Sequence, residues 1–237
     1  MDETLQRVKV HLDRKLHKNA GDSFGMLHVV QQISGEGFIP DILDSLLRHE
    51  EDLISVAANS YTHNNGFDKI TLLSSSKPSY KLRLHIWWPG STYMNEHIHN
   101  HSWDFSSAIL TGAFRFQLFE NSHHGLLLHK YLCAFPDEGV GYKMTYLGKF
   151  YLKCIFDSQF SKGNAYTLSH HVFHKIVNQE DQTTSTIILH GEFINDTSFL
   201  FSEKLIQQPH NIESVPFSPE KLYSKIKDYL KHLDDKA

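Results

Sequence analysis

The sequence has few cysteines and lacks any long apolar run. Its 237 residues include only Cys133 and Cys154, which excludes a disulfide framework and favours a reducing compartment. No apolar stretch approaches the roughly 20 residues that a membrane-spanning helix needs. The first residues, MDETLQRVKV, are charged and lack the apolar core of a signal peptide. We therefore expect a cytoplasmic protein.

The sequence also lacks a strong charge of either sign and the common catalytic motifs. The formal net charge is −4, so we expect neither a nucleic-acid nor a membrane partner. A glycine-rich phosphate loop, a G-x-S-x-G elbow and an H-E-x-x-H helix are all absent. What the chain does have is 18 histidines, spread along its length rather than gathered in a terminal tag. Histidine enrichment directs attention to metal or proton chemistry.

The apolar pattern changes twice along the chain. Residues 2–18, a stretch opened by Pro40, and residues 218–233 have apolar positions three to four apart, which predicts amphipathic helices. Between about 67 and 195, short runs rich in Thr, Tyr, Phe, Ile and Leu are broken by turn residues, as in an all-β sandwich or barrel. One such turn is expected at Asn121–Gly125. We predict a single domain overall, with an N-terminal helical segment (1–60) packed on a barrel (61–200) and a C-terminal extension (201–237).

A cluster of histidines follows Gly90. Residues two apart in a strand point to the same face, so His97 and His99 can grip one cation together. A third ligand must come from elsewhere, and the candidate segment is Gly163–Asn178, which contains His174. Imidazole suits iron, copper, nickel and zinc. His101 shares the parity of His97 and His99, so it either lines the same cavity or lies at its rim.

Two stretches around these histidines resemble the paired motifs of the cupin family. The second motif, G-x5-P-x-G-x2-H-x3-N, fits at full spacing from Gly163 through His174 to Asn178, with Ser169 and His171 in place of proline and glycine. The first fits His97-x-His99, with Asp104 in place of glutamate and small length changes after Gly90 and before Gly112. The resemblance implies a mainly β, RmlC-like cupin jelly-roll barrel, flanked here by N-terminal helices and a C-terminal helix.

Within the cupins, residues 60–195 are similar to cysteine dioxygenase and related thiol dioxygenases. The similarity lies in Trp87–Gly90 ahead of the histidine pair, in Tyr61–Asn64, and in His190 on a later strand. It implies Fe(II) on three neutral histidines, with open coordination positions for substrate and O2. It also implies that Tyr61 and His190 position the substrate or oxygen.

Departures from that family argue against L-cysteine as the substrate. His63 stands where the family has its carboxylate-binding arginine. Asp104 and Glu192 stand where the family has a crosslinked cysteine and tyrosine. We expect a more polar and more acidic cleft, bounded by His63, Asp104, Glu192 and neighbouring histidines, that suits amine, hydroxyl or imidazole groups.

Several roles stay open at this level. Asp104 is either a fourth metal ligand or a carboxylate that orients an imidazole N–H, and its odd offset from His99 requires a bulge for direct ligation. His190 and Glu192 share one face of a strand, which lines the pocket or meets water.

The preferred function is an Fe(II)-dependent oxygenase that acts on a small polar molecule, with Ni, Zn, Cu or Mn as alternative metals. A metal-dependent lyase, isomerase or hydrolase working without O2 is the first alternative, and a non-catalytic small-molecule-binding module is the second. The cupin resemblance also implies that the chain can form a homodimer, although the sequence itself indicates no interface.

Overall fold

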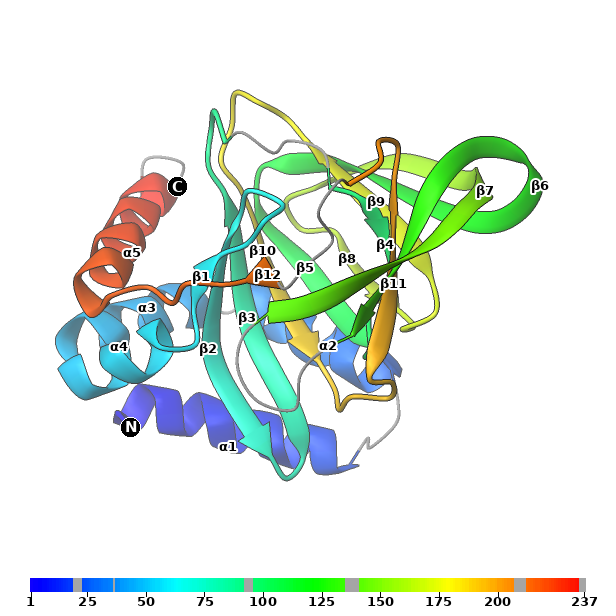
Figure 1. The fold of residues 1–237 in the computed structure, drawn as a ribbon. Coiled ribbons are helices and arrows are strands. Elements are labelled where there is room, and N and C mark those ends of the chain that lie inside the picture. Colours follow the sequence, from blue (N-terminus) through cyan, green and yellow to red (C-terminus); the bar gives the residue numbers. More distant parts are fainter. Residues whose placement is uncertain (19–22, 36, 92–95, 135–140, 207–211, 235–237) are drawn as a thin grey trace.

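The computed structural model describes residues 1–18, 23–35, 37–91, 96–134, 141–206 and 212–234. Helices gather at the two ends of the chain, as expected (Figure 1). In α1 (Glu3–Lys18), Leu5, Val8, Leu12 and Leu16 are all buried, because their spacing puts them on one face. The expected C-terminal helix is present as α5 (Pro219–Asp234). No helix among these residues is long and apolar enough to cross a membrane.

The middle of the N-terminal segment differs from expectation. Its remaining helices are α2 (Ser23–Gly35), α3 (Phe38–Arg48) and α4 (Glu50–Ala57). The pattern after Pro40 indicated one helix, but His49 has extended backbone angles that separate α3 from α4. Helix α2 packs on β5 and β8 as well as on α1 and α3. Its sequence is therefore apolar on more than one side, and it lacks the single apolar stripe by which a helix is predicted.

The rest of the described chain forms two antiparallel sheets. The first has the strand order β1-β2-β3-β10-β5-β8, and the second has the order β11-β4-β9-β6-β7-β12. The first sheet comprises β1 (Tyr61–Thr62), β2 (Asp68–Ser76), β3 (Ser79–Trp87), β10 (Thr184–His190), β5 (Phe105–Thr111) and β8 (Ala165–Leu168). The second comprises β11 (Thr197–Ser202), β4 (Ile98–His99), β9 (Phe173–Asn178), β6 (Ala113–Ala134), β7 (Gly141–Ser161) and β12 (Ile212–Glu213).

Successive strands from β3 to β11 alternate between the two sheets, except that β6 and β7 form a hairpin within one. The resulting orders β3-β10-β5-β8 and β4-β9-β6-β7 are those of an eight-stranded jelly roll, in which each sheet shields one face of the other. The predicted class, a mainly β jelly roll with N-terminal helices and a C-terminal helix, is confirmed.

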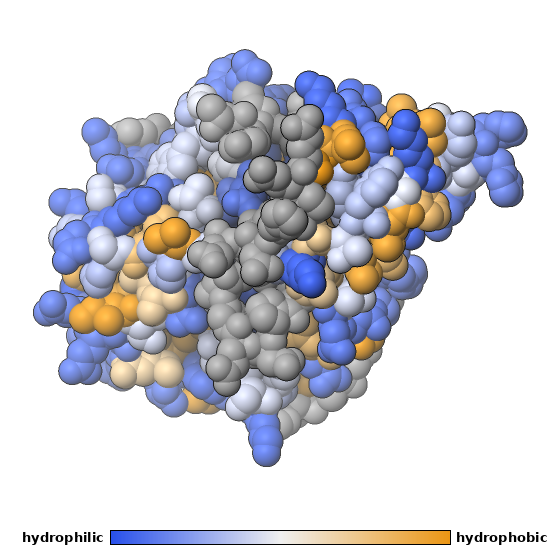
Figure 2. Space-filling model, in the orientation of Figure 1, coloured by the Kyte–Doolittle hydropathy of each residue, from blue (hydrophilic) through white to orange (hydrophobic). Residues whose placement is uncertain are grey.

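The hairpin of β6 and β7 extends from the body of the molecule as an arm (Figure 1). The turn expected at Asn121–Gly125 is absent: β6 runs through it, and a register shift between Asn121 and Leu126 absorbs the extra residues against Leu152. Apolar and hydrophilic residues are interleaved on the arm (Figure 2). Its exposed apolar side chains are Leu126, Leu127, Tyr146, Leu147, Phe150, Tyr151, Ile155 and Phe156.

The strand β3 shows how the core is divided. Tyr80, Leu82, Leu84 and Ile86 face the helices and belong to one large apolar cluster that includes residues of α1 to α5. The alternate residues Lys81, Arg83, His85 and Trp87 face the other sheet and line a cavity. A smaller apolar cluster with Trp103, Phe105 and Phe116 closes that interior. The helices therefore support the back of the sheet whose front forms the site.

Candidate metal centre and cavity

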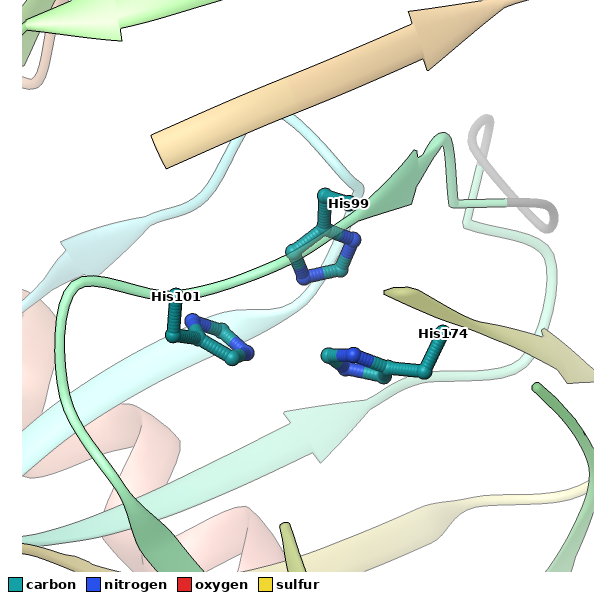
Figure 3. Close-up of side chains that lie close together, drawn as sticks. All are labelled: His99, His101 and His174. Carbon is teal, nitrogen blue, oxygen red and sulfur yellow. The ribbon is translucent and has the colours of Figure 1, made fainter. Parts of the chain in front are cut away.

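Three imidazoles converge between the two sheets. His99 ends β4, His101 follows two residues later, and His174 lies on β9. One ligand atom from each ring lies within 4.8 Å of the others. Figure 3 shows the three rings turned toward a common centre. This group could hold a metal ion.

Backbone pairing brings the distant segments together. His99 lies directly opposite His174 in the antiparallel pair of β4 and β9. Their ring centroids are 4.5 Å apart, and that of His101 is 4.9 Å from His99 and 5.1 Å from His174. Cross-strand partners put their side chains on one face at this range, so the sheet itself supplies two of the three ligand positions.

Burial keeps these rings neutral. It lowers the pKa of His99 to about 4, and it lowers those of His101 and His174 well below the usual value for histidine, with neighbouring imidazoles adding to the effect. Nδ1 of His99 lies 2.8 Å from the backbone oxygen of His97. When Nδ1 donates its N–H to this oxygen, Nε2 keeps a free lone pair. A histidine needs such a lone pair to bind a metal ion. The donor set thus fits a transition metal.

The group differs from the expected one at a single position, where His101 takes the place of His97. The His97 side chain is exposed, and it is not among the residues that line the cavity. All three residues have the same parity, but β4 contains only Ile98 and His99, so the alternation does not extend to His97. Beyond β4 the chain bends inward, and His101 stacks on Trp103 at 4.2 Å between centroids.

Asp104 has an imidazole as its partner, in line with the second expectation, but the ring belongs to His170 and not to the metal group. Its Oδ1 accepts hydrogen bonds from the backbone N–H of His170 at 2.6 Å and, at 2.8 Å, from Nδ1 of the same residue. It does not belong to the histidine group, nor is it one of the residues lining the cavity. Asp104 thus ties the loop before β9 to the chain that follows the metal group.

Tyr61 and His63, placed at the substrate end by resemblance, both line the cavity. The Tyr61 hydroxyl accepts a hydrogen bond of 2.9 Å from Nζ of Lys69. His63 stacks on Phe67 at 4.7 Å between centroids, and its Nδ1 accepts a hydrogen bond from the Asn65 backbone N–H. Burial lowers the pKa of His63 well below its usual value, followed by the charge of Lys69. His63 is therefore a neutral hydrogen-bonding group at neutral pH.

His190 and Glu192 lie outside the cavity wall. His190 is 1% exposed and stacks on Trp103 at 4.3 Å, on the strand that supports the site. Its Nδ1 lies 2.8 Å from the Gly191 backbone oxygen. Glu192 is exposed and does not line the cavity, and since β10 ends at His190 the strand alternation does not extend to it. The two residues therefore do not form a pocket-lining pair.

The cavity has a volume of about 430 Å³ and is basic rather than acidic. Lys69, Lys81 and Arg83 line it together with the metal group. The one carboxyl group among its described lining residues is Glu96, and burial raises its pKa to about 8. The expected acidic cleft is thus wrong, since Asp104 and Glu192 do not contribute to it.

These charged residues were missed at the sequence level, although a signal was present. In KLRLHIWW the alternate residues Lys81, Arg83 and His85 share one face of a strand. An alternating row of polar residues on a strand usually faces solvent, so this pattern alone did not indicate a cavity. The helices cover the opposite face instead, so this polar face is the interior one.

Comparisons with known proteins assign no family. No protein-family model and no curated protein matches the sequence. Among solved structures, the polyketide cyclase RemF from Streptomyces resistomycificus is similar with a TM-score of 0.38 and 13% identity, covering 63% of this chain and 82% of that one. An RmlC-like cupin from Shewanella frigidimarina gives 0.33 and 12%, covering 56% and 81%. For the structures of the DMSP lyases RdDddP and RnDddQII the TM-score is 0.31 and the identity is 13%. The match covers 53% of this chain and about half (47%) of that one. These likenesses are too low to carry an activity.

Proposed function

We propose that this protein is a metal-dependent enzyme whose centre is held by His99, His101 and His174. The single observation that supports this proposal is the convergence of three neutral imidazoles on one point, at the wall of a cavity of small-molecule size. A chain with no use for a metal would have to bury these rings together at a cost, because buried polar groups need partners.

For the chemistry we propose an Fe(II)-dependent oxygenase, with Ni, Zn, Cu and Mn as the alternative metals. When bound, iron(II) would supply O2 activation and a site for direct substrate ligation. The choice rests on the donor set, since three neutral imidazoles leave the charge of a divalent ion uncompensated and leave positions for further ligands. It also rests on the thiol-dioxygenase resemblance of the sequence.

The residues around the centre have separate tasks in this proposal. The Tyr61 hydroxyl hydrogen-bonds with Lys69 and Ser214, and its O–H would turn toward a substrate at the cavity wall. Neutral His63 offers a ring nitrogen at the same end. Trp103 stacks between the rings of His101 and His190 and so fixes the plane of His101. Phe105 and Tyr166 complete an aromatic wall that excludes water.

The test is metal loading followed by oxygen consumption. Metal-free protein is reconstituted anaerobically with Fe(II), and its metal content is measured by mass spectrometry. O2 uptake is then followed with panels of small thiols, amino alcohols and organic acids. We expect about one metal ion per chain and substrate-dependent O2 uptake. Failure to bind Fe(II) or any of the alternative metals would reject the metal centre. Turnover that proceeds equally under argon would reject the oxygenase and favour a lyase, isomerase or hydrolase.

A further inference from the structure

The cavity holds three basic side chains that have no acidic partner among the described residues. Lys69 comes from β2, and Lys81 and Arg83 come from β3. None of them takes part in an ion pair within the described part of the chain. Glu96, the one carboxyl among the described lining residues, interacts electrostatically with Lys175 instead, and its raised pKa leaves it mostly protonated at neutral pH. The interior therefore has an uncompensated positive charge.

Among these three residues, Arg83 is the one whose burial costs the most free energy. Its side chain is 8% exposed, and its Nε is buried without a hydrogen-bond partner among the described residues. The guanidinium lies 5.6 Å from the ring centroid of Trp103, the residue that also stacks on His101. Burial lowers the pKa of Arg83 to about 10, so it stays charged at neutral pH. A buried guanidinium with an unused donor is normally completed by an anion.

The register places the cations on one patch. Lys69 is opposite His85 and Thr71 is opposite Arg83, so Lys69 and Arg83 are diagonal neighbours on the interior face. Lys81 is two residues from Arg83 and shares that face. Burial, followed by the nearby Arg83, lowers the pKa of Lys81 and lowers the pKa of Lys69 well below its usual value, so a bound anion would favour the charged form of both. Such mutual repulsion destabilises the empty site, and a bound anion would relieve it.

We propose that Arg83, Lys69 and Lys81 form an anion-binding subsite for a small organic acid with a carboxylate or phosphate group. The planar guanidinium would bind two oxygens of that group, and the ammonium groups would supply the remaining charge. Since the same cavity is lined by His99, His101 and His174, the opposite end of the molecule faces the metal centre. The anion subsite stands on its own observations, and only its use for substrate rests on the proposed function.

Binding is tested on metal-free protein, so that the result does not depend on the metal. Succinate and inorganic phosphate are titrated at constant ionic strength, with succinamide as the neutral control, by calorimetry and by thermal unfolding. A saturable rise in the unfolding temperature with succinate, phosphate or both, but not with succinamide, is the expected result. The tighter of the two anions identifies the group that the site prefers. No saturable binding of either anion would overturn the subsite.

Variants locate the binding. We expect Arg83→Gln and Lys69→Met each to weaken anion binding by about tenfold or more, and to raise the unfolding temperature of the free protein by removing an unpaired charge. Lys162→Gln changes an exposed cation outside the cavity and should alter neither. Equal anion binding by the Arg83 variant and the native chain would reject the proposal. His174→Gln should lose the metal but keep the anion, which separates failure of the centre from failure of the subsite.

Discussion

His101 and His97 differ in one way that matters at the scale of single residues: only the first faces His174. The two are equivalent by parity, and the expected set contained His97. The structure groups His101 with His99 and His174, while the His97 side chain is exposed. His97 still contributes through its backbone oxygen, which lies 2.8 Å from Nδ1 of His99.

This distinction predicts opposite results for two alanine variants. His101→Ala should weaken transition-metal binding by about a hundredfold or more, because it removes a ligand rather than an outer hydrogen-bond partner. His97→Ala keeps the backbone carbonyl and should bind metal as the native chain does. Metal content after dialysis, measured by mass spectrometry, compares them, with circular dichroism to verify folding. Loss of metal from the His97 variant alone would restore the set expected from sequence.

Glu96 predicts a dependence of stability on pH. Its folded pKa is about 8 against an ordinary 4.5, mainly because it is buried, so the folded state holds a proton that the unfolded chain releases. In metal-free protein the ionisation of Glu96 therefore lowers the free energy of unfolding by about 1 kcal/mol per pH unit as pH rises from about 5 to 8. Below about pH 4.5, Glu96 is mostly protonated in both states, and the folded protein keeps the full stability of its neutral carboxyl.

Glu96→Gln should remove that slope and make the protein more stable at pH 8. Urea unfolding at pH 5, 6.5 and 8 measures the difference, and Glu203→Gln, an exposed acid, is the control. Identical slopes in the native chain and the Glu96 variant would show that the buried carboxyl does not hold its proton.

Among the elements, the turn from β5 to β6 depends on Gly112. Its φ is +71°, and a Cβ there would lie 2.6 Å from Oγ1 of Thr184 and 2.7 Å from the Thr183 backbone oxygen. Both contacts are too close, and the backbone oxygen cannot rotate away. The turn passes the chain from one sheet to the other, so the jelly-roll crossing needs glycine here.

Gly112→Ala should therefore destabilise the protein by about 2–4 kcal/mol. Gly163→Ala is a matched control, because Gly163 also has positive φ, +90°, but has open space around its would-be Cβ. It should cost only about 1 kcal/mol from backbone strain. Denaturant unfolding compares the two, and equal losses would mean that strain alone matters and the close contacts with β10 do not.

At the scale of the whole molecule, Asp68 connects the terminal helix to the barrel. It is 2% exposed, and its Oδ2 accepts hydrogen bonds of 2.6 Å from Nε1 of Trp88 and from Nζ of Lys225 on α5. Tyr229 of the same helix hydrogen-bonds Ser185 on β10 at 2.7 Å. These contacts, with the shared apolar cluster, favour the single domain that the sequence predicts.

We expect one cooperative unfolding transition, with far-ultraviolet circular dichroism and tryptophan fluorescence giving the same midpoint. Asp68→Asn should destabilise the whole protein by about 3 kcal/mol, because it leaves Lys225 without its buried partner. Asp228→Asn, an exposed acid on the same helix, should have little effect. A separate, earlier transition for the helices would contradict the single-domain prediction. The expected homodimer stays a prediction, which sedimentation equilibrium can measure.

The fold followed from the sequence more closely than the site did. The short runs KLRLHIWW and STIILHGEF belong to the stretch predicted to be all β, and they are present as β3 and β10. Helix α2 was missed because residues that contact both a sheet and other helices lack a clean apolar stripe. The resemblance to cupin motifs led to His99 and His174, which the strand register places opposite each other, whereas His101 joins them through the bend of the chain after β4.

The sequence by itself determined the mainly β class, the helices at the two ends and the supply of histidines, because these follow from local periodicity and composition. Only the tertiary structure decided which histidines meet and what charge the cavity has. Parity assigns a residue to a face but cannot say which face is interior, and that depends on where the helices pack. With the helices on the apolar face of β3, Lys81 and Arg83 are left inside, while Asp104 and Glu192 lie outside the cavity.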